Sequence, residues 1–179
     1  MPAEKGAVLW FTGLSGAGKT TIAKAFVRAV RAKTKLIDSD EITYIVEQRG
    51  RFTEADRIKN QKDILDEVAR FYNRGYFVLA SFITPFRRDR EFARSFFPDN
   101  FFEIFIDSPL ELCKRRDPKQ LYEKFSRGEI ENFVGCNVEY ELPDHPDLTI
   151  RTETAGVEDA VTAVVDFLRA RDIPVEKLK

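Results

Sequence analysis

The chain has 179 residues, 43% of them hydrophobic and 33% charged, which suits one globular domain with a buried core. Its formal net charge of −1 argues against a nucleic-acid partner, since such partners usually require a basic excess. Two cysteines and one histidine argue against a zinc site or disulfide framework, and no apolar run approaches the roughly 20 residues of a membrane span. We therefore expect a cytoplasmic protein without a membrane partner.

Apolar runs of strand length alternate with stretches of helical periodicity. Strands are predicted at residues 7–12, 35–38, 76–83, 101–107 and 148–151. Helices are predicted at residues 20–32, 55–73, 87–96, 110–116 and 157–170. This alternation predicts an α/β fold in three layers, with a parallel sheet of about five strands and helices on both faces. Ligands of such folds bind beyond the carboxyl ends of the strands.

The polar segment 117–147 interrupts the alternation. It is polar and contains several basic side chains together with proline and glycine residues. We predict that it forms a mobile lid. With no repeat, linker or low-complexity tract, residues 1–179 are predicted to form a single domain.

Residues 13–20, GLSGAGKT, match the phosphate-binding pattern G-x-x-x-x-G-K-[ST] between a predicted buried strand and a predicted helix. Backbone N–H groups of such a loop, together with the helix N-terminus, form an anion site. We expect Lys19 to bridge the β- and γ-phosphates of ATP and the Thr20 hydroxyl to bind Mg²⁺. The residues predicted to bind ATP here are Gly13, Ser15, Gly16, Ala17, Gly18, Lys19, Thr20 and Thr21.

This motif alone does not distinguish a kinase from a GTPase or an ATPase. The chain is short, lacks the guanine-reading motif [NT]-K-x-D and has a basic lid that would exclude water. These features favour a small-molecule kinase. A hydrolytic ATP-binding domain and a non-catalytic ATP-binding module are the alternatives.

Two carboxylates lie at the end of the second predicted strand: Asp38 is its last residue, and Asp40 follows two residues later. At the carboxyl edge of the sheet they would face the phosphate loop. One could orient Mg²⁺ through water, and the other could accept the proton of a substrate hydroxyl. The structural alternative is a helix cap, because Asp and Ser are favoured there.

Six segments along nearly the whole chain resemble the adenylylsulfate kinase family, which phosphorylates the 3′-hydroxyl of adenosine 5′-phosphosulfate. They are GLSGAGKTT at 13–21, the Asp38 and Asp40 pair, FTEADR-x-x-N at 52–60, SFITPFRRDR at 81–90, FIDSPLELCKRRDPKQLY at 105–122 and GEIENFVG at 128–135. The resemblance implies a P-loop NTPase fold, ATP and Mg²⁺ as cofactors, a nucleotide acceptor, a role in sulfate assimilation and a homodimer.

The resemblance also implies acceptor-binding residues. Arg57 and Asn60 match residues that hold the phosphosulfate, and Phe52 and Phe133 match aromatics that stack on the acceptor adenine. Ile83 matches a residue of the same pocket. A core or solvated position is the alternative for each of them.

Three further residues acquire roles through the resemblance. Lys119 matches a lysine that reaches into the site, and Arg116 matches a residue at the lid hinge where a guanidinium can stack on the ATP adenine. Thr84 occupies a position that is commonly serine in the family. Its hydroxyl could act as a nucleophile, although direct in-line transfer is the preferred mechanism.

The departures from the family pattern concern the acceptor side. Thr43 stands where the family usually has an arginine that grips the charged end of the acceptor, and Glu41 adds a negative charge nearby. Arg49 or Arg51 could compensate. A nucleotide phosphoramidate is therefore the alternative acceptor.

Overall fold

Five parallel strands form one sheet in the order β2-β3-β1-β4-β5. The structure is a computed structural model that describes residues 6–39 and 54–178. The strands are β1 (Ala7–Thr12), β2 (Thr34–Asp38), β3 (Phe77–Ser81), β4 (Phe101–Asp107) and β5 (Leu148–Arg151). The prediction of a parallel α/β sheet is confirmed.

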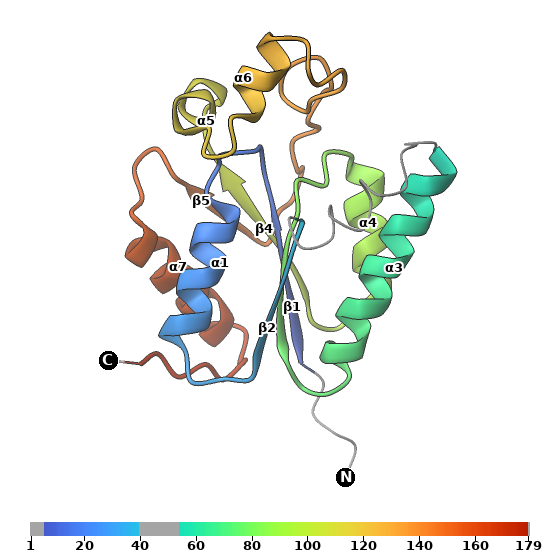
Figure 1. Ribbon diagram of the computed structural model, residues 1–179. Coiled ribbons are helices and arrows are strands. Elements are labelled where there is room, and N and C mark those ends of the chain that lie inside the picture. The colour runs from blue at the N-terminus through green and yellow to red at the C-terminus, as the bar shows by residue number, and fades with distance from the viewer. Residues whose placement is uncertain (1–5, 40–53, 179) are drawn as a thin grey trace.

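Helices cover both faces of this sheet. They are α1 (Lys19–Ala29), α3 (Glu54–Tyr72), α4 (Arg87–Phe96), α5 (Leu110–Arg116), α6 (Leu121–Ser126) and α7 (Val157–Arg169). Figure 1 shows α1 and α7 on one face, α3 and α4 on the other, and α5 with α6 beyond the carboxyl ends of the strands. Across the described residues, none of the helices has the length and apolar composition needed to cross a bilayer.

The central strand β1 is buried along its whole length and contributes to two separate cores. Leu9 and Phe11 belong to the core beneath α1 and α7. Val8 and Trp10 belong to the core beneath α3 and α4. Successive side chains of a strand point to opposite faces, so one apolar strand serves both layers.

Two elements are shorter than the sequence predicts. Helix α1 ends at Ala29 rather than at residue 32, because Val30 is extended and forms an antiparallel bridge with Lys177. Strand β3 ends at Ser81 rather than at residue 83, although the Phe82 N–H still donates to the Phe11 carbonyl of β1 at 3.1 Å.

Helix α6 lies inside the segment that the sequence predicted to be a lid without regular structure. The carboxylate of Asp117 accepts hydrogen bonds from the N–H groups of Leu121, Tyr122 and Glu123 at 2.8, 3.1 and 3.1 Å. A side chain that satisfies these otherwise unpaired groups stabilises the start of a helix. The predicted mobility of the lid stays a prediction.

Candidate active site

The phosphate loop joins β1 to α1. Its backbone is left-handed at Gly16, where φ is 77°. A Cβ atom on Gly16 would lie 2.8 Å from the carbonyl oxygen of Cys113, so this position has no room for a side chain. No side chain caps the start of α1, and its first turn contains no acidic residue. The helix N-terminus is therefore suited to bind an anion.

Lys19, the first residue of α1, points back into this loop. Its side chain is buried, with an exposed fraction of 7% for the residue. The Nζ atom donates hydrogen bonds to the carbonyl oxygens of Gly13 at 2.9 Å and Leu14 at 2.8 Å. The ammonium is thus held within the loop, where it can offset the negative charge of a phosphate.

Three hydroxyl and carboxylate groups meet beside Lys19. The Thr20 hydroxyl donates a hydrogen bond to Oδ2 of Asp38 at 2.5 Å and lies 3.2 Å from the Ser81 hydroxyl oxygen. The β2–β3 register places Asp38 opposite Ser81, and both side chains are buried. Sequence reasoning missed Ser81, because a serine at the end of an apolar strand resembles a core position.

This oxygen-only cluster fits Mg²⁺. Magnesium prefers oxygen ligands and is usually held by one or two protein groups together with substrate phosphates and water. Within residues 6–39 and 54–178 there is no group of three or more histidine, cysteine and acidic side chains that could hold a metal ion by itself. Thr20 and Asp38 are accordingly the described residues that would hold Mg²⁺.

A cavity of about 1220 Å³ extends to both sides of the phosphate loop. One wall consists of Arg116, Pro118, residues Thr152, Ala155 and Gly156 of the β5–α7 connection, and Val157 at the start of α7. The other wall consists of Trp10, Gln61, Ile64, Phe82, Ile83, Thr84, Pro85, Phe86 and Asp89. Since a pocket for one small ligand measures roughly 300–1,000 Å³, this volume is enough for two ligands that meet at the loop.

Arg116 ties the phosphate loop to the start of the β5–α7 connection. Its guanidinium donates to the Ala17 carbonyl at 3.3 Å and to the Thr152 hydroxyl and carbonyl at 3.1 and 2.8 Å. The Thr152 hydroxyl in turn donates to the Ala17 carbonyl at 3.0 Å. The stacking of Arg116 on adenine stays a prediction. Thr152 carries no local sequence signal, because its partner lies 135 residues away.

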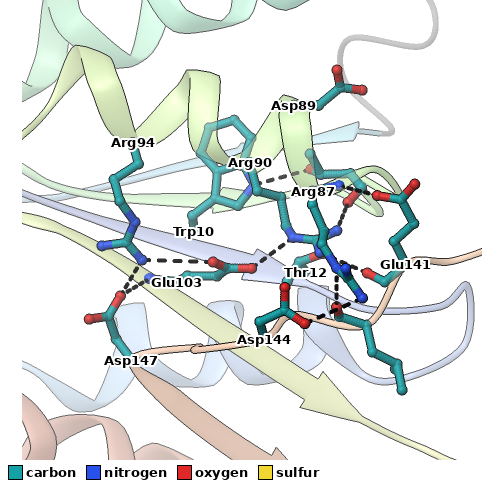
Figure 2. A network of polar contacts seen from close by, with 12 residues as sticks. Trp10, Thr12, Arg87, Asp89, Arg90, Arg94, Glu103, Glu141, Asp144 and Asp147 are labelled. Carbon is teal, nitrogen blue, oxygen red and sulfur yellow. Dashed lines mark hydrogen bonds and ion pairs between the residues drawn. The ribbon is translucent and has the colours of Figure 1, made fainter.

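Residues 82–86 form part of the second wall, and we call them the acceptor loop after the acceptor-binding role predicted for Ile83. Thr84 has a φ of 41°, and a β-branched residue with positive φ carries about 1–3 kcal/mol of strain that its surroundings must sustain. Trp10 donates from Nε1 to the Thr84 hydroxyl at 3.0 Å, and Arg90 donates from Nη1 to the Thr84 carbonyl at 2.8 Å. Figure 2 shows Trp10 and Arg90 within a network that joins β1, β4 and α4.

The network continues through a buried carboxylate on β4. Glu103 pairs with Arg90 at 2.8 Å and with Arg94 at 3.7 Å. Burial raises the pKa of Glu103, and the two guanidinium groups oppose that rise. Arg94 also contacts Asp147 at 2.6 Å, so the end of the lid segment is attached to the same cluster.

The sequence-predicted residues fall into three groups. Lys119, Ile83 and Thr84 line the cavity together with residues 15–21, while Gly13 is not among the lining residues. Phe133 does not line it; the ring is buried, 4.8 Å from Tyr122 and 6.1 Å from Phe125 between centroids. Its stacking on the acceptor therefore stays a prediction that requires the ring to leave this cluster.

The remaining predicted residues cannot be placed at the site. Asp40 and Phe52 lie outside the described residues. Arg57 and Asn60 belong to α3, but their side chains are not among those described. The acceptor-binding roles of Phe52, Arg57 and Asn60 stay predictions.

The family model for adenylylsulphate kinase matches residues 5–151. The chain belongs to the adenylylsulphate kinase family. It is 38% identical to the adenylyl-sulfate kinase of Marinobacter nauticus, over 95% of this chain and 87% of the relative. It is also 45% identical to the bifunctional enzyme NodQ of Rhizobium sp. (strain BR816), over 85% of this chain. The chain spans only 25% of the length of that NodQ relative.

Solved structures of the family have the same fold. The structure of the Mycobacterium tuberculosis APS kinase CysC in complex with AMPPNP and APS has a TM-score of 0.83 and 33% sequence identity. The similarity covers 92% of this chain and 98% of that one. The predicted P-loop fold and the family resemblance are confirmed.

Proposed function

We propose that this protein transfers the γ-phosphoryl group of ATP to the 3′-hydroxyl of adenosine 5′-phosphosulfate. The observation that carries the proposal is a single cavity that extends to both sides of the Lys19 and Thr20 phosphate loop. ATP would occupy the Arg116 side and the acceptor the side of the acceptor loop. A relative crystallised with AMPPNP and APS supports this choice of substrates.

The chemistry of phosphoryl transfer demands positioning and charge stabilisation more than covalent steps. The loop amides and Lys19 bind the phosphates and offset the charge that develops on the transferred group. Mg²⁺, held by Thr20 and Asp38, supplies further charge neutralisation when bound. The lid would exclude water, which protects ATP from hydrolysis.

The contact of Asp38 with Thr20 suggests different roles for the carboxylates of Asp38 and Asp40. A carboxylate that accepts the hydrogen bond of the metal-binding hydroxyl is suited to orient the metal. We therefore propose Asp40 as the group that orients the acceptor hydroxyl and accepts its proton. In-line transfer leaves Thr84 without a covalent role, and its hydroxyl accepts the hydrogen bond from Trp10.

An acceptor panel tests the proposed function. ATP and Mg²⁺ are supplied with adenosine 5′-phosphosulfate, adenosine or cytidine phosphoramidate, or adenylate, and ADP formation and the phosphorylated product are both measured. We expect adenosine 5′-phosphosulfate to give the highest kcat/KM, with phosphate on the 3′-oxygen. Preference for a phosphoramidate would support the alternative suggested by Thr43. Steady ADP formation without any acceptor would instead identify a hydrolase.

We further propose a cytoplasmic homodimer. Two exposed aromatic side chains of α4, Phe92 and Phe96, contact each other at 5.1 Å between ring centroids and support a subunit contact. Cys113 and Cys136 are both free thiols, which suits a reducing compartment. Light scattering coupled to size exclusion measures the mass directly, and a monomer at working concentration would refute the dimer.

A further inference from the structure

Arg90 is a buried cation between the acceptor loop and the end of the lid segment. Only 2% of the residue is exposed. Its Nε atom pairs with Glu103 at 2.8 Å, Nη1 donates to the Thr84 carbonyl at 2.8 Å, and Nη2 donates to the Glu141 carbonyl at 2.7 Å. Figure 2 shows the guanidinium at the centre of these contacts.

The ion pair with Glu103 does not by itself explain a buried arginine. A paired charge in the interior gives little stability compared with apolar side chains of the same volume, because desolvation opposes the attraction. The planar guanidinium donates hydrogen bonds in several fixed directions, so it can hold several acceptor groups in place at once. Two of these acceptors are backbone carbonyls of segments that belong to no helix or strand.

The segment 139–142, which we call the strap, also bonds directly to the acceptor loop. The Glu141 N–H donates to the Pro85 carbonyl at 2.9 Å, and the Glu141 carboxylate accepts from the Arg87 N–H at 2.7 Å. The Arg87 side chain donates to the Leu142 carbonyl at 3.0 Å. The strap is therefore bonded to both the acceptor loop and the start of α4.

A second link runs through Tyr140. The Thr12 hydroxyl donates its proton to the Ile83 carbonyl at 2.6 Å, so its contact with Tyr140 at 2.8 Å must be one in which the tyrosine donates. The Tyr140 ring stacks on Phe105 with centroids 6.0 Å apart, and the Arg90 guanidinium lies 5.6 Å from its centroid. Tyr140 thus connects the strap to the residue that precedes the phosphate loop.

We propose that Arg90 and Tyr140 are positioning residues for the acceptor. Arg90 holds the strained acceptor loop directly through the Thr84 carbonyl, and Tyr140 acts through the Thr12 hydroxyl, which it orients towards the Ile83 carbonyl. Neither touches the reacting atoms, and both act through the wall that they fix. The inference rests on the proposed function only for the identity of the acceptor. Because Thr84 is strained, the acceptor loop would relax to another conformation without support, and the contacts of Arg90 and Tyr140 provide that support.

The chain provides a matched control and a built-in reporter. Arg94 pairs with the same Glu103 but hydrogen bonds to the Phe101 carbonyl and Asp147 instead of the acceptor loop. Trp10 is the single tryptophan of the sequence, and its Nε1 donates to Thr84. Its emission and its quenching by acrylamide therefore report on the acceptor loop without any acceptor present.

The test compares Arg90→Lys with Arg94→Lys, since both substitutions keep the charge. We expect Arg90→Lys to raise KM for adenosine 5′-phosphosulfate at least about tenfold, the loss expected for a charged hydrogen bond. The Kd of a non-hydrolysable ATP analogue should stay within about twofold, and acrylamide quenching of Trp10 should increase. Arg94→Lys should leave the acceptor KM and the quenching close to those of the parent protein.

Tyr140→Phe provides an independent variant if Arg90→Lys does not fold. Loss of one neutral hydrogen bond should raise the acceptor KM about fivefold and increase Trp10 quenching, again without a change in ATP-analogue affinity. Equal effects of Arg90→Lys on both substrates, or unchanged quenching in both variants, would overturn the proposal. If the parent protein does not phosphorylate adenosine 5′-phosphosulfate, the proposed function fails, while quenching and ATP-analogue binding still decide whether these residues fix the loop.

Discussion

A comparison of Gly16 in the phosphate loop with Gly128 in the lid segment separates two requirements on a glycine: a left-handed backbone and the lack of space for a side chain. Their φ angles are nearly equal, at 77° and 75°. A Cβ on Gly16 would lie 2.8 Å from the Cys113 carbonyl oxygen, whereas a Cβ on Gly128 would have nothing within 4 Å. The substitutions Gly16→Ala and Gly128→Ala therefore impose the same left-handed conformation on alanine, but only the first adds a collision with backbone.

The expected magnitudes follow from these two terms. A left-handed alanine costs about 1–2 kcal/mol, which is the whole effect predicted for Gly128→Ala. Overpacking against backbone adds about 1–3 kcal/mol, so Gly16→Ala should lose roughly 2–5 kcal/mol of unfolding free energy. If the loop moves to relieve the collision, its amides shift, and the Kd of an ATP analogue should rise at least about tenfold.

Urea denaturation without nucleotide measures the two losses of unfolding free energy, and isothermal titration with a non-hydrolysable ATP analogue measures the affinities. Gly128→Ala should retain an affinity within about twofold of the parent protein. The steric reasoning is refuted if the two variants lose equal stability, or if Gly16→Ala binds the analogue as well as Gly128→Ala does.

Three other predictions concern the charge, the metal and the pH dependence. Lys19→Met removes an attraction to a phosphate charge worth about 4 kcal/mol, for a separation of about 4 Å and an effective dielectric constant of about 20. We therefore expect kcat/KM to fall about a thousandfold. A loss below about tenfold in steady-state assays would contradict the assignment of Lys19 as a phosphate-binding residue. Asp38→Asn keeps the shape of the side chain but weakens its hydrogen bond with Thr20. The Mg²⁺ concentration that gives half-maximal activity should rise at least about tenfold. An unchanged Mg²⁺ titration would show that Asp38 does not belong to the metal site. Burial raises the pKa of Tyr140 to about 12, against about 10 for an unfolded tyrosine, so its contribution to stability is present below pH ~10 and is lost as the pH rises towards ~12. Over that range the parent protein should lose roughly 2 kcal/mol more unfolding free energy than Tyr140→Phe, and identical slopes in urea titrations at several pH values would show that Tyr140 is not buried in this way.

Local sequence patterns were sufficient for the parts of the fold that local chemistry determines. The apolar run of β1 and the glycines of the phosphate loop predicted a strand, a loop and a helix in the correct order. Asp38 was predicted beside the loop because it ends a strand. Helix α6 was missed because it is only six residues long, although Asp117, which caps it, was a readable signal.

The parts that the sequence did not reveal depend on pairings between distant segments. Ser81 reaches Thr20 because β2 and β3 pair in one particular register. The contact of Tyr140 with Thr12 spans 128 residues and has no local pattern. Strain at Thr84 was equally invisible, since a threonine usually avoids positive φ.

The side chains of β1 alternate between two cores, and each core supports a different part of the site. The α1 and α7 layer underlies the phosphate loop, while the α3 and α4 layer underlies the acceptor loop, and a sheet separates the two. Repacking around Trp10 would therefore alter the acceptor loop through the α3 and α4 layer alone, and the hydrogen bonds of Thr12 to Ile83 and Tyr140 are the route by which such a change reaches the phosphate loop.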